Sequence, residues 1–110
     1  ILALVGGQIE ASFDGASAGV IFSSTVLPLN VWTFVVIWHD GTNLRLQQNN
    51  GTIDSTAAIF HNNGGAANLT FGAIGAGNQP LSGLVDSTQI WNRVLTLTER
   101  ATVWNSGAGV

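Results

Sequence analysis

The chain has 110 residues, the size of one domain, and only 8% of them are charged, against about 25% in an average soluble domain. Its formal net charge is -3, with arginines but no lysine, so no basic patch is available for nucleic acid or for an anionic membrane surface. Cysteine is absent, which excludes disulfides and thiolate metal sites, and no apolar run approaches the roughly 18 residues of a transmembrane helix. We therefore expect a single domain over residues 1–110 that neither binds nucleic acid nor inserts into a membrane.

The N-terminal third predicts short strands, because apolar and polar residues alternate between turn signals. Residues 1–5 are apolar and begin without a polar lead, so we expect them to form a strand of a domain whose first strands lie upstream. The alternation of Gln8–Phe13 ends at Asp14-Gly15, a dipeptide typical of tight turns. Gly19–Ser24 is the expected returning strand.

The strongest predicted strand covers Trp32–His39, because apolar residues stand on both of its faces. Its first face carries Trp32, Phe34, Val36 and Trp38, and its second face carries Val35 and Ile37. Turn signals at residues 40–43 and 49–51 bound a second strand, in which Leu44 and Leu46 alternate with Arg45 and Gln47. With a weaker strand at Thr52–Phe60, these hairpins predict a three-stranded meander.

The C-terminal half predicts further strands and then a change of period. Residues 61–65 and 75–80 are polar and glycine-rich, which indicates exposed loops around a short strand at Leu69–Gly72. A long strand is expected at Leu81–Trp91. The stretch Thr96-Leu97-Thr98-Glu99 then has capping-box spacing, and Leu97, Ala101 and Trp104 share one helical face, so we expect one short helix that ends at Gly107.

The most specific pattern also lies near the C-terminus. It comprises Gly83-Leu84-Val85-Asp86, the run Ile90-Trp91-Asn92-Arg93-Val94-Leu95-Thr96 with Glu99, and Trp104-Asn105-Ser106-Gly107. It resembles the C-terminal signature of laminin-G-like domains, and upstream landmarks of that family match at Trp32, Asp40-Gly41, Leu44–Leu46, Asn50-Gly51 and Phe71-Gly72. The ending Trp-Asn-Ser-Gly-Ala-Gly is also similar to the ends of laminin-G-like domains in bacteriophage structural proteins.

The resemblance covers Trp32 to Gly107 and implies an all-β fold. We expect an antiparallel β-sandwich of the concanavalin A-like, jelly-roll kind with one short C-terminal helix. The residues that carry the structural signature are Trp32, Gly83, Asp86, Asn92, Arg93, Glu99 and Trp104. Of the four tryptophans, Trp32, Trp38 and Trp104 are expected in the core, whereas the position of Trp91 stays open.

Catalysis is not expected. Glycoside hydrolases of this fold need two carboxylates beside the scissile bond, commonly presented as Glu-x-Asp on one strand, and no Glu-x-Asp occurs in the chain. Glu10 and Asp14 share strand parity, but Asp14 belongs to a turn signal. We therefore expect no catalytic residues and a protein that is not an enzyme.

The candidate ligand-binding residues are polar side chains of the predicted turns and loops: Asp40, Asn43, His61, Asn62, Asn63, Asn78 and Gln79. Asp40 and Asp86 are also candidate calcium ligands, although Ca²⁺ requires six or more oxygens. The alternatives that we favour are a hairpin turn at Asp40–Asn43 and a buried Asp86 carboxylate that accepts backbone hydrogen bonds. We expect no cofactor, with Ca²⁺ as the one alternative.

These observations favour a non-enzymatic recognition or assembly module on a virion or extracellular surface, such as a phage decoration or tail-associated protein, that binds a neighbouring protein or a glycan. A carbohydrate-binding appendage of a secreted bacterial hydrolase is the alternative, and a purely structural lattice subunit is a third hypothesis. The small number of charges and the apolar N-terminal strand predict an oligomer, because uncharged strand edges and apolar patches tend to pair with other chains.

Overall fold

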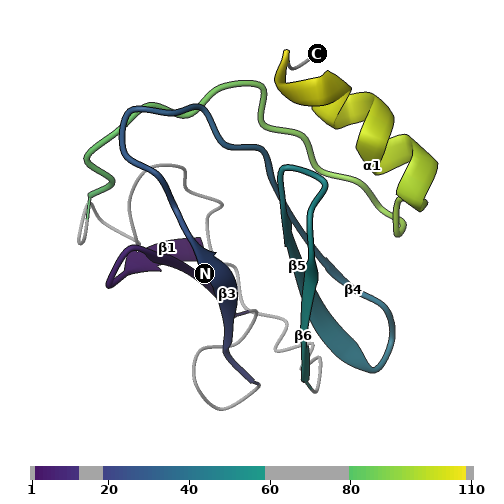
Figure 1. Ribbon diagram of the computed structural model, residues 1–110. Helices are drawn as coiled ribbons and strands as arrows, with labels where there is room; N and C mark the ends of the chain where they lie inside the picture. The colour runs from purple at the N-terminus through teal and green to yellow at the C-terminus, as the bar shows by residue number, and fades with distance from the viewer. Residues whose placement is uncertain (1, 13–18, 59–79, 109–110) are drawn as a thin grey trace.

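The computed structural model describes residues 2–12, 19–58 and 80–108, which form two antiparallel three-stranded sheets and a C-terminal helix (Figure 1). The strands are β1 (Leu2–Val5), β2 (Gln8–Ala11), β3 (Ile21–Val26), β4 (Val35–His39), β5 (Asn43–Gln48) and β6 (Ile53–Ala57), and the helices are α1 (Leu97–Trp104) and the 3₁₀ turn η1 (Asn105–Gly107). The sheet orders β1-β2-β3 and β4-β5-β6 follow the chain, so each sheet is a meander. The predicted hairpins at residues 40–43 and 49–51 are confirmed.

The core lies between the two sheets, where β3 contacts β5 and β6. Ile9 and Ala11 of β2 and Ile21 of β3 meet Leu44 and Leu46 of β5, and these side chains form one buried cluster. The alternation that predicted β2 and β5 is therefore confirmed, since these residues occupy every second position of their strands.

The helix α1 meets the second face of the β4-β5-β6 sheet through Arg100, which contacts Gln47 and Trp38. Trp38 pairs with Arg45 and Val36 pairs with Gln47, so these four side chains share the face opposite Leu44 and Leu46. The Gln47 side chain accepts a hydrogen bond from Arg100 of α1, and every residue of β4 is half-buried. The two faces of β4 are therefore each partly covered, Val35 and Ile37 by the core and Trp38 by Arg100.

A bulge interrupts the pairing of β2 with β3 between Gln8 and Glu10. There the Ile9 N–H donates to the Ser23 hydroxyl at 2.9 Å, in place of a backbone carbonyl, and that hydroxyl donates to the Thr25 carbonyl at 2.7 Å. Ser23 is buried, so its side chain satisfies a backbone donor that the bulge would leave without a partner.

The expected strand at Leu81–Trp91 is wrong. Residues 81–91 are exposed and pair with no described strand, and Ser87 has a positive φ of 52°. The alternation is present in the sequence, but a strand forms only where a neighbouring backbone supplies hydrogen bonds. Figure 1 shows this segment, in green, running as an irregular chain towards α1.

The core assignment of Trp32 is also wrong. The strand begins at Val35, and Trp32 lies before it with 64% of its surface exposed. Trp38 and Trp104 are half-buried, and Trp91 is 49% exposed. Periodicity placed Trp32 on the face of Trp38, but the extended pairing that would enforce this position starts three residues later.

Asp86 does not occupy the buried site that was expected for it. Its residue is exposed, and its Oδ1 accepts a hydrogen bond only from the neighbouring Ser87 N–H, at 2.7 Å, among the described residues. The exposed carboxylate therefore keeps its contact with water, and the expectation of a buried acceptor is corrected.

The C-terminal helix agrees with its prediction. Thr96 is the N-cap, and its hydroxyl accepts from the Glu99 N–H at 3.2 Å while Glu99 Oε2 accepts from the Thr96 N–H at 2.8 Å. Both halves of the capping box are thus present. Within the described ranges, no helix has the length and apolar character that crossing a bilayer requires.

Candidate functional site

The β4–β5 turn is organised by Asp40. Its Oδ1 accepts from the N–H groups of Thr42 and Asn43, at 3.0 and 2.8 Å, and its Oδ2 accepts from Arg45 Nε at 2.8 Å. The Asn43 and Thr42 hydrogen bonds and then the Arg45 bond lower the pKa of Asp40 from 3.8 to about 2. The turn interpretation of Asp40–Asn43 is confirmed, because both carboxylate oxygens serve the turn.

His39, the last residue of β4, joins this turn to the end of β6. Its Nδ1 accepts from the Gly41 N–H at 3.1 Å, and its Nε2 lies 3.0 Å from the Ala58 carbonyl. Since a carbonyl only accepts, Nε2 carries the proton in this arrangement. His39 thus holds the β4–β5 turn against the end of β6, at the point where the predicted strand ends.

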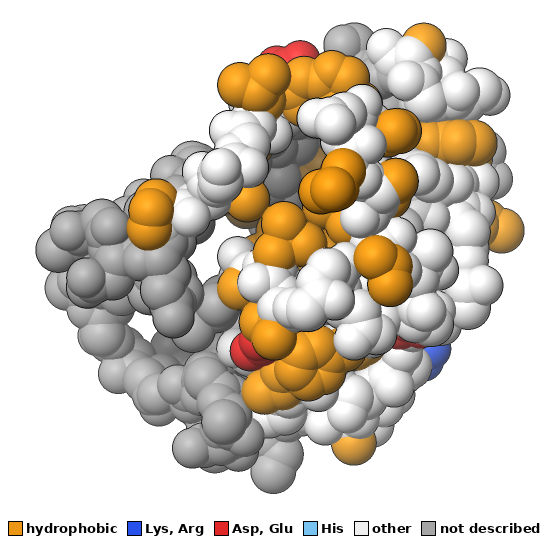
Figure 2. All heavy atoms as spheres, turned by 60° about the vertical axis from the view of Figure 1, so that its left-hand side comes forward, with side chains coloured by type: hydrophobic (Ala, Val, Ile, Leu, Met, Phe, Trp, Pro, Cys, Tyr) orange, Lys and Arg blue, Asp and Glu red, His pale blue; other side chains and the backbone are white. Residues whose placement is uncertain are grey.

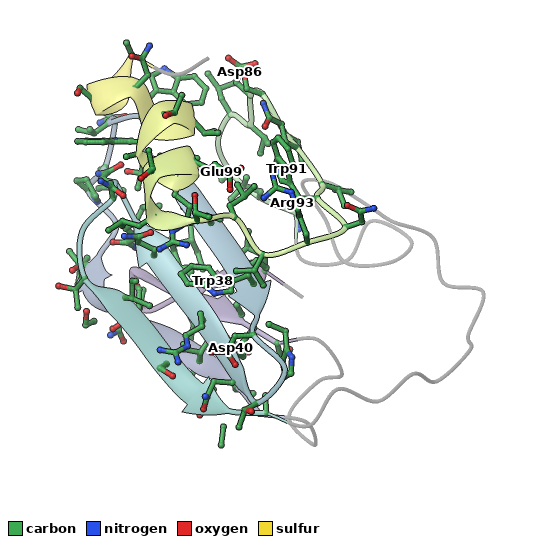
Figure 3. All side chains as sticks on the ribbon, turned by 90° about the vertical axis from the view of Figure 1, so that its right-hand side faces the viewer. Trp38, Asp40, Asp86, Trp91, Arg93 and Glu99 are labelled. Carbon is green, nitrogen blue, oxygen red and sulfur yellow. The ribbon has the colours of Figure 1, made fainter. Side chains whose placement is uncertain are left out.

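The two candidate calcium ligands lie at opposite ends of the molecule. Figure 3 shows Asp86 beside the C-terminal end of the fold and Asp40 on the β4–β5 turn, with Trp38 between them. They cannot contribute oxygens to one ion, and in the described ranges no group of three or more His, Cys, Asp or Glu side chains converges.

The signature residues near α1 form a compact cluster. Arg93 donates two hydrogen bonds to Glu99, at 2.8 and 2.7 Å, and its guanidinium lies 5.7 Å from the centre of the Trp91 ring (Figure 3). The Arg93 bonds, with that of the Thr96 N–H, lower the pKa of Glu99 from 4.5 to about 2, and the same pair raises the pKa of Arg93. The cluster therefore fastens residues 91–96 to the start of α1.

Arg100 connects α1 to the β5–β6 turn. Its side chain is buried, with 6% exposed, and its guanidinium lies 4.4 Å from the centre of the Trp38 ring. Nε donates to Gln47 Oε1 at 2.8 Å, and Nη1 donates to the Leu95 carbonyl at 2.6 Å. Gln47 Nε2 in turn donates to the Gly51 carbonyl at 2.9 Å, so a continuous hydrogen-bonded chain runs from the helix to the turn.

A polar groove of about 290 Å³ lies where β3 and the β5–β6 hairpin diverge. Its lining consists of Thr25, Gln48, Asn49, Gly51, Thr52 and Asp54. The two walls are bridged, because Asp54 Oδ2 accepts from the Ser24 N–H at 2.9 Å and Gln48 Nε2 donates to the Thr25 carbonyl at 3.3 Å. The groove thus combines hydroxyls, carboxamides and one carboxylate.

A second hollow, of about 240 Å³, is almost entirely apolar and lies against α1. It is lined by Trp91, Leu95, Thr98, Glu99, Thr102 and Val103. Glu99 is the one charged residue of this lining, and it is already paired with Arg93.

Of the seven predicted ligand-binding residues, the structure describes only Asp40 and Asn43, which lie together in the β4–β5 turn. Asn43 begins β5 and bonds to Asp40, whereas His61, Asn62, Asn63, Asn78 and Gln79 lie outside the described residues. Of the remaining signature residues, Gly83 and Asn92 are exposed in the irregular segment. The expected strand at Leu69–Gly72 and the turn at Asp14-Gly15 also lie outside the described ranges.

Sequence reasoning missed the groove and Arg100. The groove joins residues of β3 to residues of the β5–β6 hairpin, and no motif links them along the chain. Arg100 carried a usable signal, because it precedes Trp104 by one helical turn and so falls on the half-buried side of α1.

Two meanders packed face to face and closed by a capped helix define a concanavalin-like β-sandwich. The chain matches the laminin-G-type family described as the concanavalin A-like lectin/glucanases superfamily over residues 2–99, and it belongs to this family. The resemblance seen in the sequence is thereby confirmed at the level of the family. Comparison with curated proteins and with solved structures finds no significant match.

Proposed function

We propose that the protein is a non-enzymatic recognition and assembly module on a virion or extracellular surface, where it attaches to a neighbouring protein or to a glycan. The family supports a carbohydrate- or protein-binding domain. The observation that carries the finer proposal is the exposure of large apolar side chains in a chain that has few charges.

Large exposed apolar residues lie in segments 29–32 and 81–97, and a further group lies on β1 and β3. Leu29 is 88% exposed, Leu84 is 81% exposed and Ile90 is 70% exposed. Figure 2 shows hydrophobic side chains spread over one face of the molecule with few charged ones among them. Apolar patches of this kind mark sites where another molecule excludes water.

Two of the carboxylates, those of Asp40 and Glu99, support a binding role over a catalytic one. A glycoside hydrolase needs a carboxyl group that is protonated near neutral pH, and the pKa of such an acid is raised. Asp40 and Glu99 instead have a pKa of about 2, because each is held by an arginine and by backbone N–H groups. They therefore stay ionised and serve as structural acceptors.

The placement on a virion or another extracellular surface rests on composition. Neutral amides and hydroxyls supply most of the polarity, and the chain has 8% charged residues. A subunit whose apolar surface is covered by neighbours needs fewer charges to remain soluble. A carbohydrate-binding appendage of a secreted hydrolase is the alternative, and the polar groove is the observation that favours it.

Light scattering tests the assembly part of the proposal. We expect the scattering mass to rise above the 11.4 kDa of one chain across the micromolar range. Replacing two exposed apolar residues, in a Leu84→Asn/Ile90→Asn variant, should return the mass to that of a monomer. Thr88→Asn is the matched control, because Thr88 is exposed in the same segment and contributes no large apolar surface.

A glycan array separates the two kinds of partner. Glycan binding by the monomeric variant would assign the module to sugar recognition, whereas assembly without any glycan signal would assign it to subunit contacts. A wild-type chain that stays monomeric at all concentrations and binds no glycan would contradict the proposal.

A further inference from the structure

We propose that the groove between β3 and the β5–β6 turn is a binding site for a neutral, polyhydroxylated ligand, and that Arg100 positions the turn that forms its wall. This inference rests on the proposed recognition function and deepens it by naming the site and the ligand chemistry. It differs from the sequence-based candidates, since it involves neither the Asp40 turn nor Asp86.

The lining residues have the donors and acceptors that a sugar ring requires. Thr25 and Thr52 carry hydroxyls, Gln48 and Asn49 carry carboxamides, and Asp54 carries a carboxylate. Asp54 uses only Oδ2 in its bond with the Ser24 N–H, so Oδ1 has no hydrogen bond to the described residues. A carboxylate oxygen at the edge of an open groove is a strong acceptor for a ligand hydroxyl.

The charge of the groove restricts the ligand. Asp54 is the one ionisable residue among the six that line it, so the site has no cation for an anionic ligand. The Asp54 carboxylate would repel a phosphate or a uronic acid, whereas a neutral polyol would find hydrogen-bond partners and no repulsion. A volume of about 290 Å³ is near the lower bound of roughly 300 Å³ for small-molecule pockets, which fits one or two sugar units.

The β5–β6 turn that lines the groove is held by hydrogen bonds that lead to Arg100 of α1. The Gly51 carbonyl accepts from Gln47 Nε2 at 2.9 Å, and Gln47 Oε1 accepts from Arg100 Nε at 2.8 Å. The Gly51 N–H also donates to the Gln48 carbonyl at 2.7 Å, so both backbone groups of Gly51, its N–H and its carbonyl, are hydrogen-bonded. A wall fixed in advance lowers the entropic cost of ordering the site when a ligand binds.

The segment before β4 is tied to the same wall. Phe34 N–H donates to Asn49 Oδ1 at 2.9 Å, and the Asn49 N–H donates to the Phe34 carbonyl at 2.9 Å. These two reciprocal bonds hold Asn49, a lining residue of the groove, against the start of β4.

The test is a titration of ¹⁵N-labelled protein with D-glucose, D-galactose, D-mannose and N-acetyl-D-glucosamine at millimolar concentrations, in the presence of EDTA. We expect at least one sugar to shift the backbone amides of residues 49–52 and Thr25 saturably. Asp54→Asn keeps an oxygen for the Ser24 N–H and should weaken binding about tenfold. Asp40→Asn is the matched control and should leave the affinity unchanged.

A second variant isolates the positioning role. Arg100→Met should reduce the protection of the Gly51 amide against hydrogen exchange even without sugar, while the spectrum stays dispersed. Arg93→Met, which removes the exposed arginine, should leave that amide as it is.

Three results would overturn the assignment: no sugar shifts the amides of the groove, the shifts centre on residues 40–43 or 86, or Asp54→Asn binds as the wild type does. An unchanged Gly51 amide in Arg100→Met would overturn the positioning role. Sugar binding elsewhere, or concentration-dependent assembly without sugar binding, would refute this site while leaving the recognition module intact.

Discussion

Trp38 and Trp32 show how strongly the environment of one residue depends on its backbone. Both belong to the same alternating pattern, but Trp38 lies inside β4 and packs under the Arg100 guanidinium at 4.4 Å. The Trp38 ring and the Gln47 and Leu95 oxygens stabilise this buried cation, and no carboxylate of the described residues pairs with it. Trp32 precedes the strand and has no comparable cover.

Glu99 gives the first prediction, which concerns acid stability. Its pKa is lowered from 4.5 to about 2 in the folded chain, so it contributes stability that is fully present above pH 4.5 and is lost as the pH falls towards 2. We expect Glu99→Gln to lower the melting temperature at neutral pH, with a difference from the wild type that narrows between pH 4.5 and pH 2. Thermal melts followed by circular dichroism measure this.

Asp40 complicates the comparison, because its pKa is also lowered to about 2 and it contributes in the same range. The useful quantity is therefore the difference in melting temperature between variant and wild type at each pH. Asp40 contributes equally to both proteins, so its contribution cancels in this difference. A difference that stays constant from pH 7 to pH 2 would contradict the role of the Arg93–Glu99 pair.

At the scale of elements, Gly19, which precedes β3 of one sheet, lies close against the end of β6 of the other. A Cβ added there would lie 2.8 Å from the Ala57 carbonyl and 3.1 Å from the Ala58 Cβ, at the end of β6. Its φ of 103° is also unfavourable for other residues. We expect Gly19→Ala to destabilise the fold by about 2 to 4 kcal/mol, the sum of overpacking and backbone strain.

Gly41 is the matched control for this change. Its φ is 102°, nearly that of Gly19, but nothing lies within 4 Å of an added Cβ. Gly41→Ala should therefore show the backbone cost alone, and the difference between the two variants in denaturant unfolding isolates the contact between the sheets. If both variants lost the same free energy of unfolding, the close contact of Gly19 with the end of β6 would contribute nothing to the cost.

The elements that could be predicted are those whose signals are local. The hairpins of β4, β5 and β6 are defined by turn residues within each loop, and α1 is defined by a capping box over four residues. The segment 81–91 has alternation but no partner strand among the described residues, and pairing is a property that one segment cannot encode alone.

Local and long-range contacts also differ in how well the candidate site could be predicted. The Asp40 turn could be predicted, because its hydrogen bonds join residues at most five apart. The groove could not, because the Ser24–Asp54 bond spans 30 residues and the Gln47–Arg100 bond spans 53. Such pairs follow from the packing of the two sheets and the helix, which a single sequence does not display.

On the scale of the whole molecule, every positive side chain is engaged internally. Arg45 bonds to Asp40, Arg93 bonds to Glu99, and Arg100 is buried against Trp38 and Gln47. The chain has three arginines and no lysine, so the surface presents hardly any free cation to a partner. Recognition must then depend on apolar contact, neutral hydrogen bonds and the remaining carboxylates, which agrees with a neutral ligand in the groove.

This charge arrangement leads to a prediction about the isoelectric point, which is about 4.9 from the sequence. Asp40 and Glu99 have ordinary pKa values of 3.8 and 4.5 when unfolded but about 2 when folded, so the folded chain keeps negative charge that the unfolded chain loses on acidification. The native protein should therefore focus at a lower pH than the same chain in concentrated urea, by roughly a few tenths of a unit. Isoelectric focusing across a urea gradient measures the difference, which should shrink in an Asp40→Asn/Glu99→Gln variant. If native and unfolded chains focus together, the two carboxylates are not held as their hydrogen bonds indicate.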